Sequence, residues 1–316
     1  MLSDSLRSRL EELNRERLPG AIPAKPPAPG RKPGGASCTA PAGVQPSGDL
    51  LESAVVCENA GGEHLVIPIP VDRLWPGGES RVAARLDHLR TLPEDRLAAG
   101  MAPLVAAMPA SAVMLDLETC GLAGSAVFLV GLLRVVEGRL TVELLFARSY
   151  AEERAVMHSL WNRLAGDGSD AANGDGSDRD GSDRDSSDRD SSDRDGDQPC
   201  SVIATFNGKS FDWPMVMDRS RRHLLHKTQP LREPPHLDML HPARRRWKGR
   251  LPDCKLQTIE RLVCRRTRVG DIPGSQIPAA YDAYVRTGRP GEMEAVLHHN
   301  ALDLVTLLDI AMRLAA

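Results

Sequence analysis

Two acidic residues, Asp116 and Glu118, stand at the end of the apolar run that begins at Ala112, and Thr119-Cys120-Gly121 follows them. Side chains at positions i and i+2 of a strand point to the same face, so both carboxylates would project together. Two such charges repel each other, and burial strengthens the repulsion. Mg²⁺ or Mn²⁺, which prefer oxygen ligands, would relieve it. Taken alone, however, the pair is explained more simply as a solvated strand end.

Two later segments add further acids and two histidines. Residues 203–214 predict a strand, a glycine-containing turn and a helix that begins at Asp212 and runs through Leu225. Residues 296–308 predict a C-terminal helix with one buried side, because apolar residues recur there at helical spacing: Leu297, Ala301, Leu304, Leu308 and Ala311. His299 is four residues before Asp303 and shares its face. His298 is five residues before Asp303 and lies to one side of it.

These acids form a set that resembles the DEDD superfamily of 3′–5′ exonucleases: Asp116, Glu118, Asp212 and Asp303. Four segments are similar to one branch, the bacterial YprB family of RNase H-like proteins: Asn207–Asp212, His241–Lys248, Asp271–Gly274 and His299–Asp303. The resemblance covers roughly residues 105–316, apart from one insertion. Together the motifs are far more specific than any one of them.

The resemblance implies an α/β protein with an RNase H-like mixed β-sheet flanked by helices. It also implies two bound ions, Mg²⁺ or Mn²⁺. Asp116 would bridge both ions, Glu118 and Asp303 would hold the ion on the nucleophile's side, and Asp212 would hold the second. A side chain near Asp303 would orient or deprotonate the attacking water. The superfamily uses His five residues before the last Asp, the spacing of His298, or Tyr four before it, the spacing of His299. The YprB-like pattern places His-Asn at 299–300, and the helical register puts His299 beside Asp303, so His299 is preferred and His298 is kept as the alternate.

The expected sheet follows from apolar runs in the core. Strands are predicted at Val113–Leu117, Val127–Val136 and Leu140–Phe146, as an antiparallel meander, and at Val202–Phe206. A helix is predicted at Ala151–Leu164 between the third and fourth strands. In the RNase H-like arrangement the first strand lies centrally beside the fourth.

The domain organisation is expected to have three parts. Residues 1–48 predict a charged helix and a flexible segment rich in Pro, Gly and Ala. Residues 49–110 predict a small N-terminal extension of unknown role, with an edge strand at Leu65–Pro70 because proline is tolerated there. Residues 111–316 form the RNase H-like exonuclease domain. Residues 167–199 interrupt it with four Ser-Asp-Arg-Asp repeats and a net charge of −8, which predicts a disordered insertion.

The remaining charge is basic. The whole chain has a net charge of −3, so the residues outside the insertion carry about +5. Residues 244–268 contain ten Lys or Arg and only two acids, Asp253 and Glu260. We expect nucleic-acid contacts from this tract and from the turn motif: Asn207, Arg244, Arg245, Arg246, Trp247 and Lys248. Trp247 would stack on a base, although a core position is an equal alternative.

The sequence therefore predicts a metal-dependent nuclease, a 3′–5′ exonuclease acting on single-stranded DNA or RNA. A nucleic-acid-binding module that retains the fold without turnover is the alternative from another class. A haloacid-dehalogenase-type phosphatase is disfavoured, because Glu118 replaces the second Asp of that motif and no paired-acid motif follows. No run of eighteen apolar residues and no secretory signal pattern is present, so a cytoplasmic protein without membrane association is expected.

Overall fold

A computed structural model describes residues 50–121, 124–166, 198–229 and 231–316. By its internal contacts the chain divides into two units, Met1–Ala40 and Pro41–Ala316, and all described residues belong to the second. The predictions for residues 1–48 therefore lie outside the described residues. So does the predicted insertion at 167–199, apart from its last two residues.

One mixed sheet of seven strands, in the order β1-β2-β5-β4-β3-β6-β7, organises the described residues. The strands are β1 (Val55–Asn59), β2 (Gly62–Pro70), β3 (Ala112–Thr119), β4 (Val127–Val136), β5 (Arg139–Phe146), β6 (Val202–Thr205) and β7 (His236–Asp238). The pairs β1–β2, β2–β5, β5–β4 and β4–β3 are antiparallel. The pairs β3–β6 and β6–β7 are parallel. The fold is α/β, with β3 central between β4 and β6, which is the arrangement that the resemblance implies.

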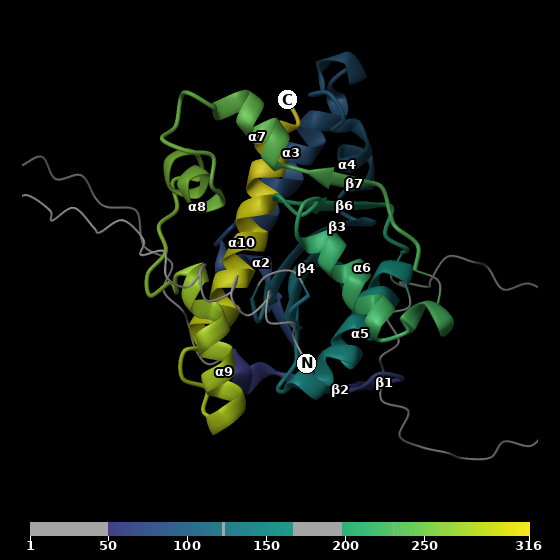
Figure 1. The fold of residues 1–316 in the computed structure, drawn as a ribbon. Helices are drawn as coiled ribbons and strands as arrows, with labels where there is room; N and C mark the ends of the chain where they lie inside the picture. Colours follow the sequence, from purple (N-terminus) through teal and green to yellow (C-terminus); the bar gives the residue numbers. More distant parts are fainter. Residues whose placement is uncertain (1–49, 122–123, 167–197, 230) are drawn as a thin grey trace, which may run out of the picture. The chain divides into compact units, whose positions relative to one another are not determined.

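Helices cover both faces of this sheet (Figure 1). The α-helices are α2 (Val71–Leu74), α3 (Gly78–Thr91), α4 (Ala102–Ala107), α5 (Glu153–Ala165), α6 (Asp212–Arg222), α7 (Leu240–Trp247), α8 (Leu256–Ile259), α9 (Ile277–Thr287) and α10 (Met293–Leu314). Helix α10 packs on β4 at Gly131, whereas α5 reaches Glu143 of β5, which pairs with Leu132 of β4. Neighbouring residues of a strand face opposite sides, so α10 and α5 cover opposite faces.

The four predicted core strands are confirmed, with bounds within two residues of those expected. The β4–β5 hairpin closes through Glu137 and Gly138, and both residues have positive φ, at 49° and 74°. Two-residue hairpin turns with positive φ at both positions match the right-handed twist of the strands they join. This turn fixes the register of β4 against β5, in which Gly131 lies opposite Leu144.

Two strands from the N-terminal extension enlarge the sheet beyond the predicted core. The predicted edge strand is part of β2, which pairs with β5 over Leu65–Pro70 but with β1 only over Gly62–Val66. The stretch that contains Pro68 and Pro70 is thus open on its outer side, where a missing N–H costs no ladder hydrogen bond. The extension is consequently continuous with the main sheet.

Helix α10 is buried more completely than the sequence predicts. The apolar stripe predicts one buried side, but 18 of its 22 residues are buried, His298, His299 and Asn300 among them. Of the helices in the described ranges, α10 is the one that is long and apolar enough to cross a membrane. However, 89% of its most apolar 18-residue stretch is buried inside the protein. A core helix has the same length and composition, and its polar residues must find partners within the fold.

Candidate metal centre

The two acids of β3 face α10. Asp116 pairs with Gly131 across the β3–β4 ladder, and Glu118 pairs with Leu129. Asn300 of α10 occupies the space above Gly131, and its Nδ2 donates a 2.8 Å hydrogen bond to Asp116 Oδ2. A Cβ atom at position 131 would lie 1.9 Å from Asn300 Oδ1, so only glycine admits Asn300 there. The glycine in β4 therefore sets the distance between the helix and the acidic strand.

A tight turn after β6 positions Asp212, the first residue of α6. Asn207 has a positive φ of 70°, and its N–H donates a 2.8 Å hydrogen bond to Asp238 Oδ1. Lys209 N donates to Asp238 Oδ2 over 3.2 Å. Gly208 lies against Asp212, because a Cβ there would be 2.6 Å from Asp212 Oδ2. Asp238, at the end of β7, thus fixes the backbone that presents Asp212.

Both carboxylate oxygens of Asp303, on α10, have a charged or ionisable neighbour. Arg268 Nη2 donates to Asp303 Oδ1, and His299 Nε2 lies 3.5 Å from Asp303 Oδ2. The other ring nitrogen, His299 Nδ1, is 2.7 Å from Asp271 Oδ1. Arg268 also donates to Glu260 Oε2 over 2.6 Å through its Nε. A chain of alternating charges therefore holds Asp303 and His299 in place.

Burial and neighbouring carboxylates raise the pKa of three of these acids: Asp116, Glu118 and Asp212. Burial, followed by the charges of Asp303, Asp212 and Glu118, raises the pKa of Asp116 well above its usual range. Burial raises the pKa of Glu118 to about 8, with His299 opposing the shift. Burial and the charge of Asp238 raise the pKa of Asp212 to about 7. Repulsion among buried carboxylates of this kind favours a cation as a partner.

The two histidines differ in their electrostatics. Burial alone would lower the pKa of His299, but the hydrogen bond to Asp271 and the charges of Asp303 and Glu118 raise it overall. Burial and the charge of Arg268 lower the pKa of His298. No hydrogen-bond partner for His298 Nε2 is found in the part of the chain that the structure describes. The unprotonated form is thus favoured at His298, and His299 serves as a partner of carboxylates.

The donor set fits a hard divalent ion, because its members are carboxylates that gain from a cation. Asn300 Oδ1 adds a buried oxygen with no hydrogen-bond partner among the described residues. As the side chains stand, however, no three or more His, Cys, Asp or Glu within the described ranges form a group that could hold a metal ion. The ion pair between Arg268 and Asp303 uses one oxygen that such a group would need.

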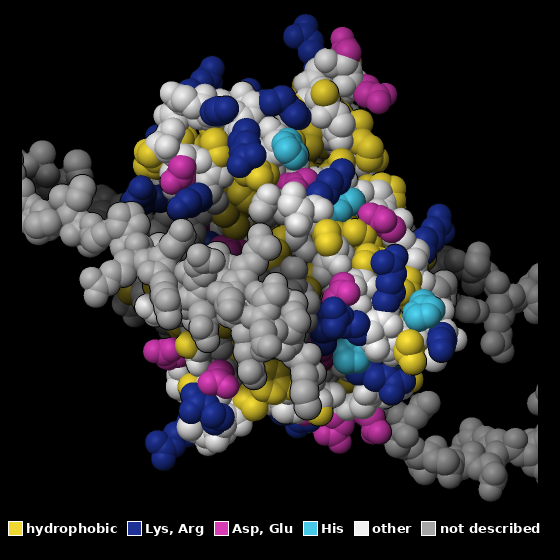
Figure 2. All heavy atoms as spheres, viewed as in Figure 1, with side chains coloured by type: hydrophobic (Ala, Val, Ile, Leu, Met, Phe, Trp, Pro, Cys, Tyr) yellow, Lys and Arg dark blue, Asp and Glu magenta, His cyan; other side chains and the backbone are white. Residues whose placement is uncertain are grey.

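The basic tract is divided by the fold. Arg244, Arg245, Arg246 and Lys248 are exposed along α7 and just after it, and Trp247 is half-buried. Lys and Arg side chains gather over α7 and α8 on the face shown in Figure 2. Further along the tract, Arg266 and Arg268 point inward and pair with acids. Their partners are Glu260, inside the tract, and Asp303 and Asp309, outside it.

Four residues of this site were not identified from the sequence as part of it: Asp238, Arg268, Asp271 and Asn300. Asp271 and Asn300 stand inside segments that carry the family resemblance, and that was their only signal. Asp238 is the last residue of a three-residue strand, which is too short for periodicity to reveal. Arg268 is 35 residues from Asp303 along the chain, so their pairing depends on the path of the intervening segment.

Comparisons with known proteins bear on the family and the fold of this chain. Residues 183–315 match the family described as the RNase H superfamily. The sheet order and this match define the chain as an α/β protein with an RNase H-like fold. The curated "Uncharacterized protein YprB" of Bacillus subtilis (strain 168) is 29% identical over 204 residues, which cover 63% of this chain and 41% of that protein. Both findings support a YprB-like, RNase H-like family, although the chain spans about two fifths of the relative's length.

Proposed function

We propose that this protein is a metal-dependent nuclease that hydrolyses phosphodiester bonds. The observation that carries the proposal is the mutual electrostatic interaction of Asp116, Glu118, Asp212 and Asp303 on the α10 side of the central strand. Half-buried and buried carboxylates that interact in this way destabilise a fold unless a cation compensates them. The RNase H superfamily is generally composed of nucleases, which supports the same assignment.

The metal-holding residues would be the four acids, with Mg²⁺ or Mn²⁺ as the ions. Two ions, when bound, supply an activated water and compensate the charge that develops on the phosphoryl oxygens. Asn300 restrains Asp116 through its 2.8 Å hydrogen bond, and Gly208 leaves room for Asp212 Oδ2. Metal binding would compete with Arg268 for Asp303, so this ion pair sets part of the cost of loading the site.

A histidine of α10 handles the proton of the attacking water. His299 is the preferred residue, since Asp271 fixes its Nδ1 and leaves Nε2 toward Asp303. Its raised pKa favours the imidazolium in the metal-free protein, and cations held by the acids would lower that pKa. His298 is the alternate, because its lowered pKa keeps it neutral and its Nε2 has no partner among the described residues.

The finer proposal is a 3′–5′ exonuclease that acts on single-stranded DNA or RNA. It rests on the resemblance of the four acids to the DEDD set and on the exposed arginines of α7, which suit a phosphate backbone. Asn207 is exposed in the turn beside Asp212 and would contact the strand near the acids. A cytoplasmic location belongs to the same proposal.

A non-catalytic nucleic-acid-binding module is the second candidate. The ion pair between Arg268 and Asp303 favours it, because a permanently paired Asp303 would not complete a metal site. In that case the basic surface of α7 would bind nucleic acid and no bond would be cleaved.

The deciding experiment is degradation of end-labelled single-stranded DNA and RNA with and without Mg²⁺ or Mn²⁺. Asp116→Asn and Asp303→Asn should abolish turnover while leaving metal-free binding unchanged or tighter. Asp218→Asn is the matched control, because Asp218 is an acid on α6 whose side chain is 43% exposed. Metal-independent binding without cleavage by the wild type would favour the binding module. Cleavage retained by Asp116→Asn would contradict the site assignment.

A further inference from the structure

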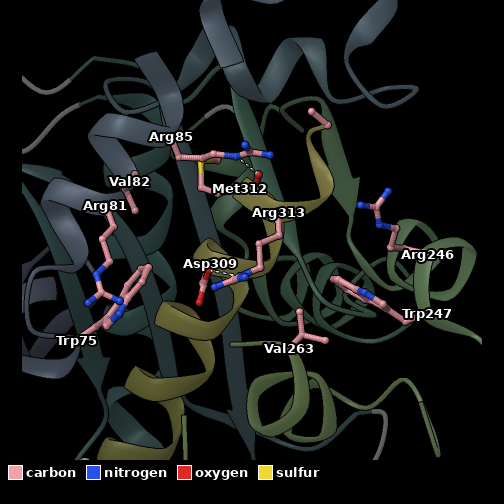
Figure 3. A pocket seen from close by; sticks show the side chains of 11 residues that line it. Trp75, Arg81, Val82, Arg85, Arg246, Trp247, Val263, Asp309, Met312 and Arg313 are labelled. Atoms are coloured by element: carbon pink, nitrogen blue, oxygen red, sulfur yellow. Dashed lines mark hydrogen bonds and ion pairs between the residues drawn. The ribbon is translucent and has the colours of Figure 1, made fainter. Parts of the chain in front are cut away.

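A basic and aromatic pocket lies between the N-terminal extension and α7, at the C-terminal end of α10. Its volume is about 490 Å³, which is within the range of small-molecule sites. Trp75 and Arg81 stand on one side and Trp247 on the other, with Asp309 and Arg313 of α10 between them (Figure 3). Three segments that are far apart in the sequence thus meet around one space.

The charge of this pocket is strongly positive. Four arginines line it, and one acid, Asp309, opposes them: the arginines are Arg81, Arg85, Arg246 and Arg313. Arg313 Nε donates to Asp309 Oδ1 over 2.7 Å, and Arg85 Nε donates to the Met312 carbonyl over 3.3 Å. Arg81 and Arg246 are exposed, and within the described ranges neither makes an ion pair. Two guanidinium groups on opposite walls therefore remain available for an anionic ligand.

The two tryptophans have different roles. Trp75 is only 9% exposed, and both Arg266, at 4.8 Å from the ring centroid, and Arg81, at 5.9 Å, lie over its ring. Trp75 is thus already occupied by contacts within the protein. Trp247 is half-buried at the end of α7 and lines the opposite wall. A half-buried indole beside the exposed Arg246 offers a stacking surface for a planar base.

The pocket and the acid cluster lie on different faces of α10. Asp309 is six residues beyond Asp303, which corresponds to about 9 Å along the helix axis and a rotation of roughly 120° around it. Asp303 faces Arg268 and His299, whereas Asp309 faces Arg313 and Arg266. A ligand in the pocket would therefore be bound apart from the reacting phosphodiester.

We propose that this pocket is a nucleotide-binding subsite: Arg81 and Arg246 bind the phosphate and Trp247 stacks on the base. The choice of a nucleotide rests on the proposed nuclease function, while the positive charge and the aromatic wall stand independently of it. The nucleotide is either a free mononucleotide or one unit of a single strand that extends from the acid cluster. The subsite gives the N-terminal extension, through Arg81, a role in substrate or product binding.

The test measures binding in EDTA, so that catalysis does not contribute. Adenosine monophosphate and a single-stranded oligonucleotide are titrated by calorimetry into the full chain and into pocket variants. Arg81→Ala and Arg246→Ala should each weaken binding about tenfold, as expected for loss of a charge-assisted hydrogen bond. Trp247→Leu should weaken it similarly, and Trp247→Phe should restore most of the affinity because a stacking face returns.

Arg286→Ala is the matched control, since Arg286 is an exposed arginine on α9, with its side chain 68% exposed. It should leave both affinities unchanged, and thermal melts verify that every variant is folded. Pocket-dependent binding of the mononucleotide identifies a free-nucleotide site, and pocket-dependent binding of the oligonucleotide alone identifies a strand subsite. Either result supports the proposal.

Two outcomes would overturn the proposal. One is oligonucleotide binding that no pocket variant weakens, together with no mononucleotide binding. The other is binding of polyglutamate that depends on Arg81 and Arg246 but not on Trp247, which would identify a site for acidic peptides. Failure of the nuclease proposal is a separate result, because it is read from cleavage with metal and from the Asp116→Asn variant.

Discussion

His299 Nδ1 lies 2.7 Å from Asp271 Oδ1, which fixes the imidazole between Asp271 and Asp303. This contact joins the segment before α9 to α10 across 28 residues. In the proposed reaction Asp271 would be a positioning residue, because it would act through His299 rather than touch the substrate. The same contact raises the pKa of His299 against the effect of burial.

Asp271→Asn should therefore lower the turnover number and also change its pH dependence. Removal of the carboxylate lowers the pKa of His299, so the acidic limb of the rate profile should move to lower pH even as the maximum falls. The measurement is initial rate against pH for wild type and variant. Asp282→Asn replaces an acid on α9 that pairs with exposed Arg286, and it should change neither the turnover number nor the position of the acidic limb. A reduced rate with an unmoved limb would show that Asp271 is only structural.

Asp116→Asn should raise the melting temperature of the metal-free protein. The raised pKa of Asp116 means that the folded state holds a proton which the unfolded state releases, so stability is lost as pH rises above the ordinary value of 3.8. The gain from the variant should therefore be larger at pH 8 than at pH 5. About 1 kcal/mol would appear as roughly 2–4 °C in a domain of 150–250 residues.

The same variant should abolish stabilisation by metal. Mg²⁺ or Mn²⁺ should raise the melting temperature of the wild type, because the ions bind the folded state preferentially. The shift should grow with pH as Glu118 and Asp212, with pKa values of about 8 and about 7, lose their protons. Asp218→Asn should respond to metal as the wild type does. Equal metal shifts in wild type and Asp116→Asn would remove the proposed centre.

Gly131→Ala should destabilise the protein by about 1–3 kcal/mol, the usual cost of overpacking a core. The added Cβ would lie 1.9 Å from Asn300 Oδ1 and 2.7 Å from Leu304 Cδ1, so α10 must move away from β4. Chemical denaturation gives the free energy of unfolding. Gly274→Ala is the control, because its Cβ would meet no atom within 4 Å. Equal stability of the two variants would mean that α10 does not rest on Gly131 as described.

Glu153→Gln should destabilise the protein at neutral pH by roughly 1–3 kcal/mol, because it weakens hydrogen bonds to a buried charge. Burial alone would raise the pKa of Glu153, but hydrogen bonds from His223, Arg219 and the Val127 N–H lower it overall. A lowered pKa contributes stability that is present above the ordinary value of 4.5 and is lost as pH falls through the folded value.

The difference in unfolding free energy between wild type and Glu153→Gln should accordingly shrink below pH 4.5. Denaturation at pH 7, 5 and 3 measures it. Glu58→Gln, at an exposed acid on β1, should match the wild type throughout. A difference that stays constant down to pH 3 would show that the charge of Glu153 does not stabilise the fold.

Arg245→Ala should reduce the salt dependence of nucleic-acid binding. Each lost phosphate contact should lower the slope of log affinity against log salt by roughly 0.7 on a single strand. Affinity should fall about equally for all sequences, because phosphates carry no base information. A salt titration of wild type and Arg245→Ala, with Arg286→Ala as control, measures the slope. An unchanged slope after replacement of residues 244–248 together would make this tract an ordinary solvated surface.

The individual strands and helices around the site can be predicted from the amino-acid sequence. Apolar residues recur at strand or helix spacing in three places: the strand of Asp116, the β4–β5 hairpin and α10. This periodicity predicts the type of each element, because strands and helices place their side chains at different intervals. The resemblance to the DEDD set identifies the four acids, because this set is recognised by its residue types and the motifs around them. Both signals are readable without knowledge of how the segments pack.

The long-range contacts between these strands and helices are visible only in the folded protein. The contact between Asn300 and Gly131, the pairing of Arg268 with Asp303 and the support of Asp212's turn by Asp238 join residues 30 or more positions apart. Such contacts depend on sheet order and helix packing, which no local pattern encodes. The pocket between Arg81 and Trp247 arises for the same reason, since two segments far apart in sequence are brought together by packing against the end of α10.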